Sequence, residues 1–216
     1  MSVFYTSDLH IGHKFVAGLR GFWDEDNVVG DYVNPYVGEH TAEALPDTDA
    51  HDSWLADIWD STVKKDDQVF VLGDISINGG QHALDWIAAR PGTKHLIAGN
   101  HDPVGPWDRR AVKKLPEWLK YFETVQPYLR RKLNGQNLLL SHFPYQSWGD
   151  GPERDGSRFD QYRLLELDLP LLHGHTHGTE RAHGNMLHVG VDAWKGNLVS
   201  QEYVMSWLES LKEKAA

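Results

Sequence analysis

Three short apolar runs in the first half of the chain each end in a turn that carries metal-ligand side chains. The runs at 3–6, 68–72 and 95–98 lead into Asp8-x-His10, Gly73-Asp74 and Gly99-Asn100-His101-Asp102, respectively. Between them, apolar residues at 54–63 and 83–88 follow helical spacing. This order of strand, loop and helix predicts an open α/β sheet, with the clusters meeting beyond the carboxyl ends of its strands.

Two further clusters follow in the second half, where the pattern becomes β-rich. Residues 124–133, the turn Asn134-Gly135 and residues 137–141 predict a β-hairpin with a type I′ turn that leads into His142. The strands predicted at 169–173 and 186–191 flank Gly174-His175-Thr176-His177, and Ser200 is expected to open an amphipathic C-terminal helix. We therefore expect a single domain over residues 1–216 with two β-rich halves.

Residues 24–52 are rich in Asp, Gly, Asn, Pro and His and show no clear periodicity. We expect a long surface excursion with little regular structure, in a position to cover the site as a lid. Asp52 or Ser53 is expected to cap the helix that follows.

The composition limits the chemistry of the clusters. No cysteine is present, so any metal site must use nitrogen and oxygen ligands. The formal net charge of -10 opposes binding to long nucleic acid, which depends on Lys and Arg. The sequence shows no signal peptide and no long apolar stretch, so we expect a soluble cytoplasmic protein without membrane contact.

The spacing of the ligand types suits divalent cations. Asp8 and His10 are two residues apart, so in an extended segment both side chains lie on one face and can bind one cation. His175 and His177 repeat this spacing and can serve one cation, or two if the chain turns there. Asp74 has two carboxylate oxygens, which suit it to bridge two metals. Each cluster alone has a simpler explanation, a turn, a helix cap or, for His142, a satisfied buried histidine. The five together favour a two-metal centre for phosphoester hydrolysis.

The five clusters in this order resemble the calcineurin-like metallophosphoesterases, whose pattern is D-x-H, G-D, G-N-H-D/E, H and G-H-x-H. The match runs from Asp8 to His177, and residues 5–13 look like a short bacterial and bacteriophage branch. The resemblance implies an α/β fold, a four-layer α/β/β/α sandwich. It also implies a first metal bound by Asp8, His10 and His177, a second bound by Asn100, His142 and His175, and a bridging Asp74.

Other residues near the clusters are candidates for catalysis or substrate binding. By the resemblance, His101 faces the phosphoryl group and protonates the leaving oxygen or stabilises charge. Asp102 is a second catalytic candidate, because it can hydrogen-bond a histidine and set its tautomer, but it can equally stabilise a turn. His13, Asn100 and His101 are the candidate substrate contacts. Basic side chains that can contact phosphate are Lys14, Arg109 and Arg110.

Three histidines of the second half lie outside the family pattern. His173 points to the same strand face as His175, which favours a role in supporting the ligands or in filling the strand's buried face. His183 and His188 are interpreted as loop or strand residues.

We predict a dinuclear-metal phosphodiesterase that hydrolyses small diesters such as cyclic nucleotides through a metal-bridging hydroxide. The alternatives are a phosphomonoesterase, a nucleotide pyrophosphatase and, without catalysis, a metal-binding interaction module. A zinc hydrolase of the metallo-β-lactamase type would need His-x-His-x-Asp-His, and residues 173–178 lack its Asp-His ending. The expected cofactors are two divalent cations, Mn²⁺ by resemblance, with Fe, Zn, Ni and Co also suited to such ligands. The expected partner is a small, nucleotide-like phosphoester.

Overall fold

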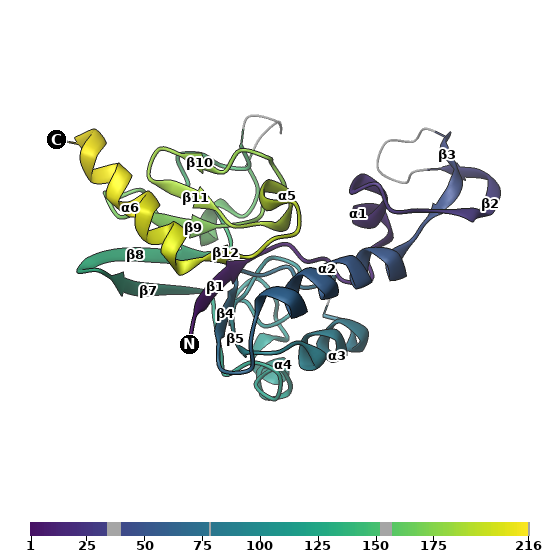
Figure 1. The fold of residues 1–216 in the computed structure, drawn as a ribbon, viewed down its shortest axis with the longest axis horizontal. Helices are drawn as coiled ribbons and strands as arrows, with labels where there is room; N and C mark the ends of the chain where they lie inside the picture. Colours follow the sequence, from purple (N-terminus) through teal and green to yellow (C-terminus); the bar gives the residue numbers. More distant parts are fainter. Residues whose placement is uncertain (34–39, 78, 152–156, 216) are drawn as a thin grey trace.

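Two five-stranded sheets form the centre of the protein, with helices packed beside them (Figure 1). The structure is a computed structural model that describes residues 1–33, 40–77, 79–151 and 157–215. Within these ranges, no helix combines the length and the apolar character that crossing a bilayer would require.

The first sheet has the strand order β12-β1-β4-β5-β6. Its strands are β1 (Val3–Thr6), β4 (Gln68–Val71), β5 (Thr93–Ile97), β6 (Thr124–Gln126) and β12 (Val199–Ser200). All are parallel except β12, which pairs antiparallel with β1. Parallel pairing with helices between the strands confirms the open α/β sheet predicted for the first half.

Helices α2 (Thr48–Thr62), α3 (Gln81–Ala89) and α4 (Ala111–Trp118) connect the parallel strands. They cover one face of the first sheet. The helical spacing of the sequence predicted α2 and α3, whereas α4 was not predicted. Leu55, Trp59 and Ile87 pack there against Val69 and Val71. This packing leaves the other face of the sheet for the second half of the chain.

The second sheet has the order β10-β11-β9-β8-β7. Its strands are β7 (Tyr128–Leu133), β8 (Gln136–Ser141), β9 (Leu171–His173), β10 (Ala182–His183) and β11 (Met186–His188). Strands β7 and β8 form the predicted hairpin, and φ values of 46° at Asn134 and 80° at Gly135 confirm the type I′ turn. The prediction also placed residues 124–126 in this hairpin, but they form β6 of the first sheet.

The two sheets pack face to face. One core cluster lies between them. It contains Tyr5 and Phe70 of the first sheet, Leu72 directly after β4, and Leu140 and Leu172 of the second sheet. Neighbouring residues on the strands of the second sheet point to its outer face, as alternation along a strand requires. Leu139, Leu171 and Met186 of these strands pack there with the loop residues Tyr145, Trp148 and Leu164.

The C-terminal segment closes the side of the core between the sheets. It comprises α5 (Val191–Trp194), β12 and α6 (Gln201–Ala215), and a short 3₁₀ helix, η1 (Asp160–Tyr162), lies in the preceding loop region. Val204, Trp207 and Leu208 of α6 join the core cluster between the two sheets. The layers of helices and two packed sheets confirm the predicted α/β sandwich.

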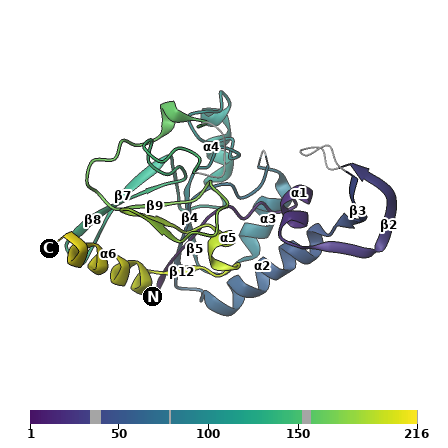
Figure 2. The ribbon, with the colours of Figure 1, turned by 90° about the horizontal axis from the view of Figure 1, so that it is seen from above.

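The excursion at residues 24–52 differs from the prediction. It contains an antiparallel hairpin of β2 (Trp23–Val33) and β3 (His40–Pro46), with residues 34–39 outside the described part. The hairpin lies beside α1 (Lys14–Leu19) and extends away from the two sheets rather than over them (Figures 1 and 2). The expectation of little regular structure was wrong, because backbone pairing builds a hairpin without an alternating apolar face.

The cap predicted for the helix that follows was also wrong. Helix α2 begins at Thr48, and Asp47 caps it by accepting a hydrogen bond from Ala50 N at 2.8 Å. Asp52 lies inside the first turns, where its carboxylate accepts hydrogen bonds from Gly12 N and from a ring nitrogen of His82. This contact ties α2 to the loop that follows β1.

Candidate metal centre

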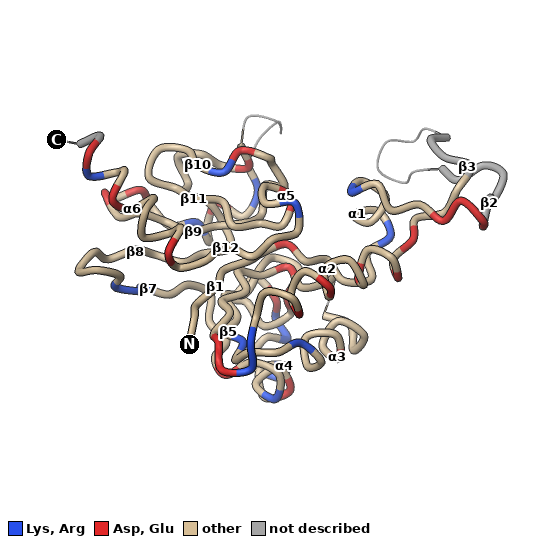
Figure 3. The backbone as a smooth tube through the Cα atoms, viewed as in Figure 1, with Lys and Arg blue, Asp and Glu red and all other residues tan. Residues whose placement is uncertain are grey.

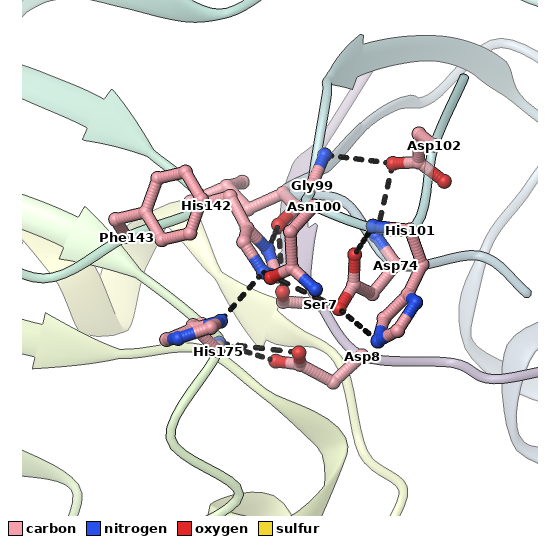
Figure 4. Close-up of polar contacts among 12 residues, drawn as sticks. Ser7, Asp8, Asp74, Gly99, Asn100, His101, Asp102, His142, Phe143 and His175 are labelled. Atoms are coloured by element: carbon pink, nitrogen blue, oxygen red, sulfur yellow. Dashed lines mark hydrogen bonds and ion pairs between the residues drawn. The ribbon is translucent and has the colours of Figure 1, made fainter. Parts of the chain in front are cut away.

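The seven predicted ligands converge where strands of both sheets end. Figure 4 shows five of them, Asp8, Asp74, Asn100, His142 and His175. Residues that follow β1, β4 and β5 of the first sheet meet residues that follow β8 and β9 of the second. Among the described residues, two groups of three have ligand atoms that all lie within 4.8 Å of one another. They are Asp8, His10 and His177, and Asp74, His142 and His175.

Five of the seven have a left-handed backbone. Their φ values are 61° at Asp8, 51° at His10, 53° at Asp74, 73° at His175 and 56° at His177. This conformation costs a residue with a Cβ about 1–2 kcal/mol. It is supported by backbone hydrogen bonds between the loops, from Asp8 N to Gly73 O and from His10 N to Asp74 O, both of 3.0 Å. Such strain gathered in one place is typical of functional sites.

Glycines let the loops approach closely. A Cβ on Gly174 would overlap Ser7 Oγ and come within 2.5 Å of Asp8 Oδ2. Gly73 has φ +89°, and a Cβ there would overlap the backbone of Gly99. The glycines of the G-D and G-H-T-H clusters therefore set the spacing between the loops as well as their turns.

Around His142, several atoms that can bind a metal lie close together. His142 Nδ1 donates to a backbone carbonyl at 2.7 Å, so in the neutral ring, the form that binds a metal, Nε2 carries the lone pair. That Nε2 lies 3.0 Å from Asn100 Oδ1, 3.2 Å from His175 Nδ1 and 3.4 Å from Asp74 Oδ2. The other nitrogen of His175, Nε2, donates to Asp150 Oδ1 at 3.0 Å, which leaves its Nδ1 as an acceptor. Four acceptors therefore converge, as they would around a cation.

The second group is built in the same way around His177. His177 Nδ1 donates to Asp192 Oδ2 at 2.9 Å, and its Nε2 then faces His10 Nε2 at 3.1 Å. Asp8 Oδ1 lies 3.9 Å from His177 Nε2. Asp74 Oδ2 lies 3.9 Å from His10 Nε2 as well as beside His142, so this one oxygen lies between the two groups.

The electrostatics of the centre favour positive charge among its ligand atoms. Burial lowers the pKa of His10 well below its usual value and that of His175 to about 4. Burial also acts to lower the pKa of His142, but the Asp74 carboxylate outweighs it and raises the pKa to about 9. For Asp74, burial acts to raise the pKa, but His142 and His10 hold it well below the usual range. The donor set, imidazole nitrogen with carboxylate and amide oxygen, fits divalent transition metals.

Asp102 does not have the catalytic contact expected of it. Its buried carboxylate accepts hydrogen bonds from the backbone amides of Gly99 at 2.7 Å, Asp74 at 3.0 Å and Ile75 at 3.3 Å. Among the described side chains, no histidine hydrogen-bonds this carboxylate. Burial and the neighbouring Asp74 raise its pKa to about 7. The structure therefore supports the turn-stabilising alternative, in which Asp102 holds two ligand loops together.

His101 and His13 border the cavity above the two groups. The His101 side chain is 39% exposed, and its Nε2 lies 4.0 Å from Asp74 Oδ2. The His13 ring lies 5.5 Å from the His10 ring. The cavity has a volume of about 280 Å³ and is lined by His10, His13, Phe15, Val16, Leu19, Asp74, Ile77, Asn100, His101, Arg158, His175 and His177. All three candidate substrate contacts are thus in the lining.

The basic candidates lie elsewhere. Lys14 lines a neighbouring cavity, Arg110 pairs with Asp108 on the surface, and Arg109 is exposed and outside the lining. The one Lys or Arg in the lining is Arg158, which the sequence did not single out.

The three other histidines differ in their surroundings. His173 and His188 are buried and stacked with ring centroids 5.2 Å apart, and His173 Nδ1 donates to Gly174 O. His183 is exposed and stacks on Trp148. His173 thus supports the loop that carries His175, in agreement with one of its two interpretations.

Two carboxylates that orient candidate ligand histidines were not predicted from the sequence. Asp192, which holds His177, accepts two hydrogen bonds of 2.8 Å from Arg20 Nε and Nη2. Arg20 Nη2 also donates to the backbone oxygen of Asp8 at 2.7 Å. Asp150, which holds His175, forms ion pairs with Arg158 and the buried Arg163. A ligand histidine needs an acceptor for its second nitrogen, but only the fold selects which acid supplies it.

The chain is similar to one family model and to several known proteins over most of its length. The family model of the calcineurin-like phosphoesterases matches residues 1–203. The gene 66 protein of Mycobacterium phage L5 is 37% identical, over 99% of this chain and 97% of that protein. The gene 66 protein of Mycobacterium phage D29 is 39% identical, over 98% of each. Among solved structures, the protein of unknown function AQ665 from Aquifex aeolicus has a TM-score of 0.60 at 18% identity, over 95% of this chain and 98% of that one.

Proposed function

The chain belongs to the calcineurin-like phosphoesterase family, and on this premise we propose that it hydrolyses phosphodiester bonds of small, nucleotide-like substrates with two divalent cations, Mn²⁺ first among them. The family makes it a phosphoester hydrolase. The preference for diesters, the cation and the substrate class, including cyclic nucleotides, are parts of the proposal.

The observation that carries the proposal is the convergence of imidazole, carboxylate and amide ligand atoms in two adjoining groups. One cation would be held by Asp8, His10 and His177 and the other by His142, His175 and Asn100, with Asp74 between them. Bound cations of this kind lower the pKa of a water molecule and neutralise charge on a phosphoryl group.

The chain's own residues would bind the substrate and move a proton. His101 borders the cavity with a partly exposed ring, in a position to protonate the leaving oxygen from a ring nitrogen. Its backbone N donates to Asp74 Oδ1 at 2.9 Å, which ties it to the carboxylate between the two groups. Arg158, at the cavity wall, would bind a non-bridging phosphate oxygen.

The space around the centre favours a small diester. A second cavity of about 420 Å³ shares Val16, Leu19 and His177 with the first, so there is room for an organic group on each side of a phosphate. Lys and Arg are scattered around the molecule rather than gathered on one face (Figure 3). A long nucleic acid would need a continuous basic surface.

The decisive experiment uses metal-stripped protein reconstituted with Mn²⁺. The expected result is faster turnover of bis(4-nitrophenyl) phosphate than of 4-nitrophenyl phosphate, and hydrolysis of a 2′,3′- or 3′,5′-cyclic nucleotide. Asp74→Ala should abolish turnover, while the control Asp66→Ala, at an exposed position, should not. Faster monoester turnover would overturn the diester proposal, and full activity of Asp74→Ala would overturn the metal centre.

A further inference from the structure

One wall of the cavity is apolar and open to solvent. Phe15 and Leu19 come from α1, and Ile77 from the loop after β4. Leu19 is 69% exposed and Ile77 is 36% exposed, whereas Val16 beside them is buried. Large apolar side chains that stay exposed inside a cavity indicate a surface that a ligand covers.

The apolar wall lies directly beside the candidate metal ligands. The His13 ring lies 5.5 Å from the ring of His10 and 6.4 Å from the ring of Phe15. Asp74 and Ile77 are three residues apart on one loop, and both line the cavity. A phosphoryl group at the two ligand groups would therefore place its organic substituent against these side chains.

The charges of the cavity set a second condition. Arg158 is the one Lys or Arg in the lining, and its Nε already donates to Asp150 Oδ2 at 2.9 Å. One partly neutralised guanidinium suits a single phosphoryl group. The additional negative charge of a pyrophosphate would find no second cationic side chain among the residues of this lining.

We propose that Phe15, Leu19 and Ile77 form a subsite for an uncharged aromatic or apolar group, so that the preferred substrates are single-phosphate esters carrying such a group. The inference rests on the proposed function, because it takes the phosphoryl group to bind between the two ligand groups. The subsite would select among small phosphoesters by their organic group, whereas the metal ligands contact only the phosphoryl group.

The test measures binding of phenylphosphonate and methylphosphonate, which have the same charged head and a carbon–phosphorus bond that is not hydrolysed. Both are titrated calorimetrically into Mn²⁺-loaded protein and assayed as inhibitors of bis(4-nitrophenyl) phosphate hydrolysis. We expect phenylphosphonate to bind about tenfold more tightly, because covering part of a phenyl ring and of Leu19 removes apolar surface from water.

The double variant Leu19→Ser/Ile77→Ser should bring the two dissociation constants to within about twofold of each other. Both positions are exposed, so the fold should tolerate the change. The matched control is Leu165→Ser/Leu167→Ser, at residues 62% and 73% exposed and outside the cavity, which should keep the tenfold preference.

Equal binding of the two phosphonates by the wild type would overturn the subsite, as would an unchanged preference in the Leu19 and Ile77 variant. If diesters are turned over in either case, the proposed function stands and the subsite alone fails. If neither phosphonate binds and no phosphoester is hydrolysed, the proposed function fails, and the subsite fails with it.

Discussion

Replacing Asp192 by Asn should weaken one of the two proposed metal sites and leave the other nearly intact. The Asp192 carboxylate accepts the Nδ1 proton of His177 at 2.9 Å and two hydrogen bonds from Arg20. The substitution keeps the shape of the side chain but removes its charge. It also turns one acceptor into a donor, which must face either His177 or Arg20.

The expected loss follows from these contacts. Removing the acceptor that orients a ligand histidine typically lowers metal affinity about 10–100-fold, which corresponds to about 1.4–2.7 kcal/mol. Arg20 keeps its hydrogen bonds to the backbone oxygens of Asp8 and Leu9, so its side chain stays partly satisfied. We therefore expect the free energy of unfolding to fall by only about 1–2 kcal/mol.

The assay is a calorimetric titration of Mn²⁺ into metal-stripped protein, with metal content measured after dialysis at defined free Mn²⁺. Asp150→Asn is the reciprocal variant, because Asp150 orients His175 of the other ligand group. Asp60→Asn is the neutral control, since Asp60 pairs with Arg90 on the surface away from the centre. Asp192→Asn and Asp150→Asn should each weaken a different one of the two Mn²⁺ binding steps.

The reasoning is refuted if Asp192→Asn binds both metals as the wild type does while remaining folded. Equal weakening of both steps by Asp192→Asn and by Asp150→Asn would also refute it, because each carboxylate would then act on the centre as a whole. Melting temperature and circular dichroism establish that each variant is folded before the affinities are compared.

Three further predictions concern the same centre. His101→Gln should lower kcat by about 10²–10⁴-fold, as loss of a general acid does, with both metals retained, and loss of metal would contradict its assigned role. Gly174→Ala should destabilise the protein by about 1–3 kcal/mol and weaken metal binding, because its Cβ would overlap Ser7 Oγ, and a wild-type melting temperature would argue against this packing. Asp102→Ala should unfold more easily, because it leaves three backbone amides without their acceptor at about 1–3 kcal/mol for each buried group. A variant of normal stability without activity would restore a catalytic role for Asp102.

Much of the fold was predictable because its determinants are local. The helical spacing of Leu55 and Trp59, and the turn chemistry of Asn134 and Gly135, act within a few residues of chain. The hairpin of β2 and β3 was not predictable in this way. Its pairing depends on backbone hydrogen bonds and shows no apolar alternation that a sequence pattern would reveal.

The sequence by itself determined which side chains can bind metal, because ligand types at the ends of apolar runs are a local property. Only the tertiary structure decided which nitrogen of His175 and of His177 faces the centre. That choice depends on Asp150 and Asp192, which lie 25 and 15 residues from the histidines they orient. The same holds for Asp102, whose carboxylate reaches amides 27 and 28 residues away. Contacts of this kind form only when the loops of both sheets meet, so no local pattern encodes them.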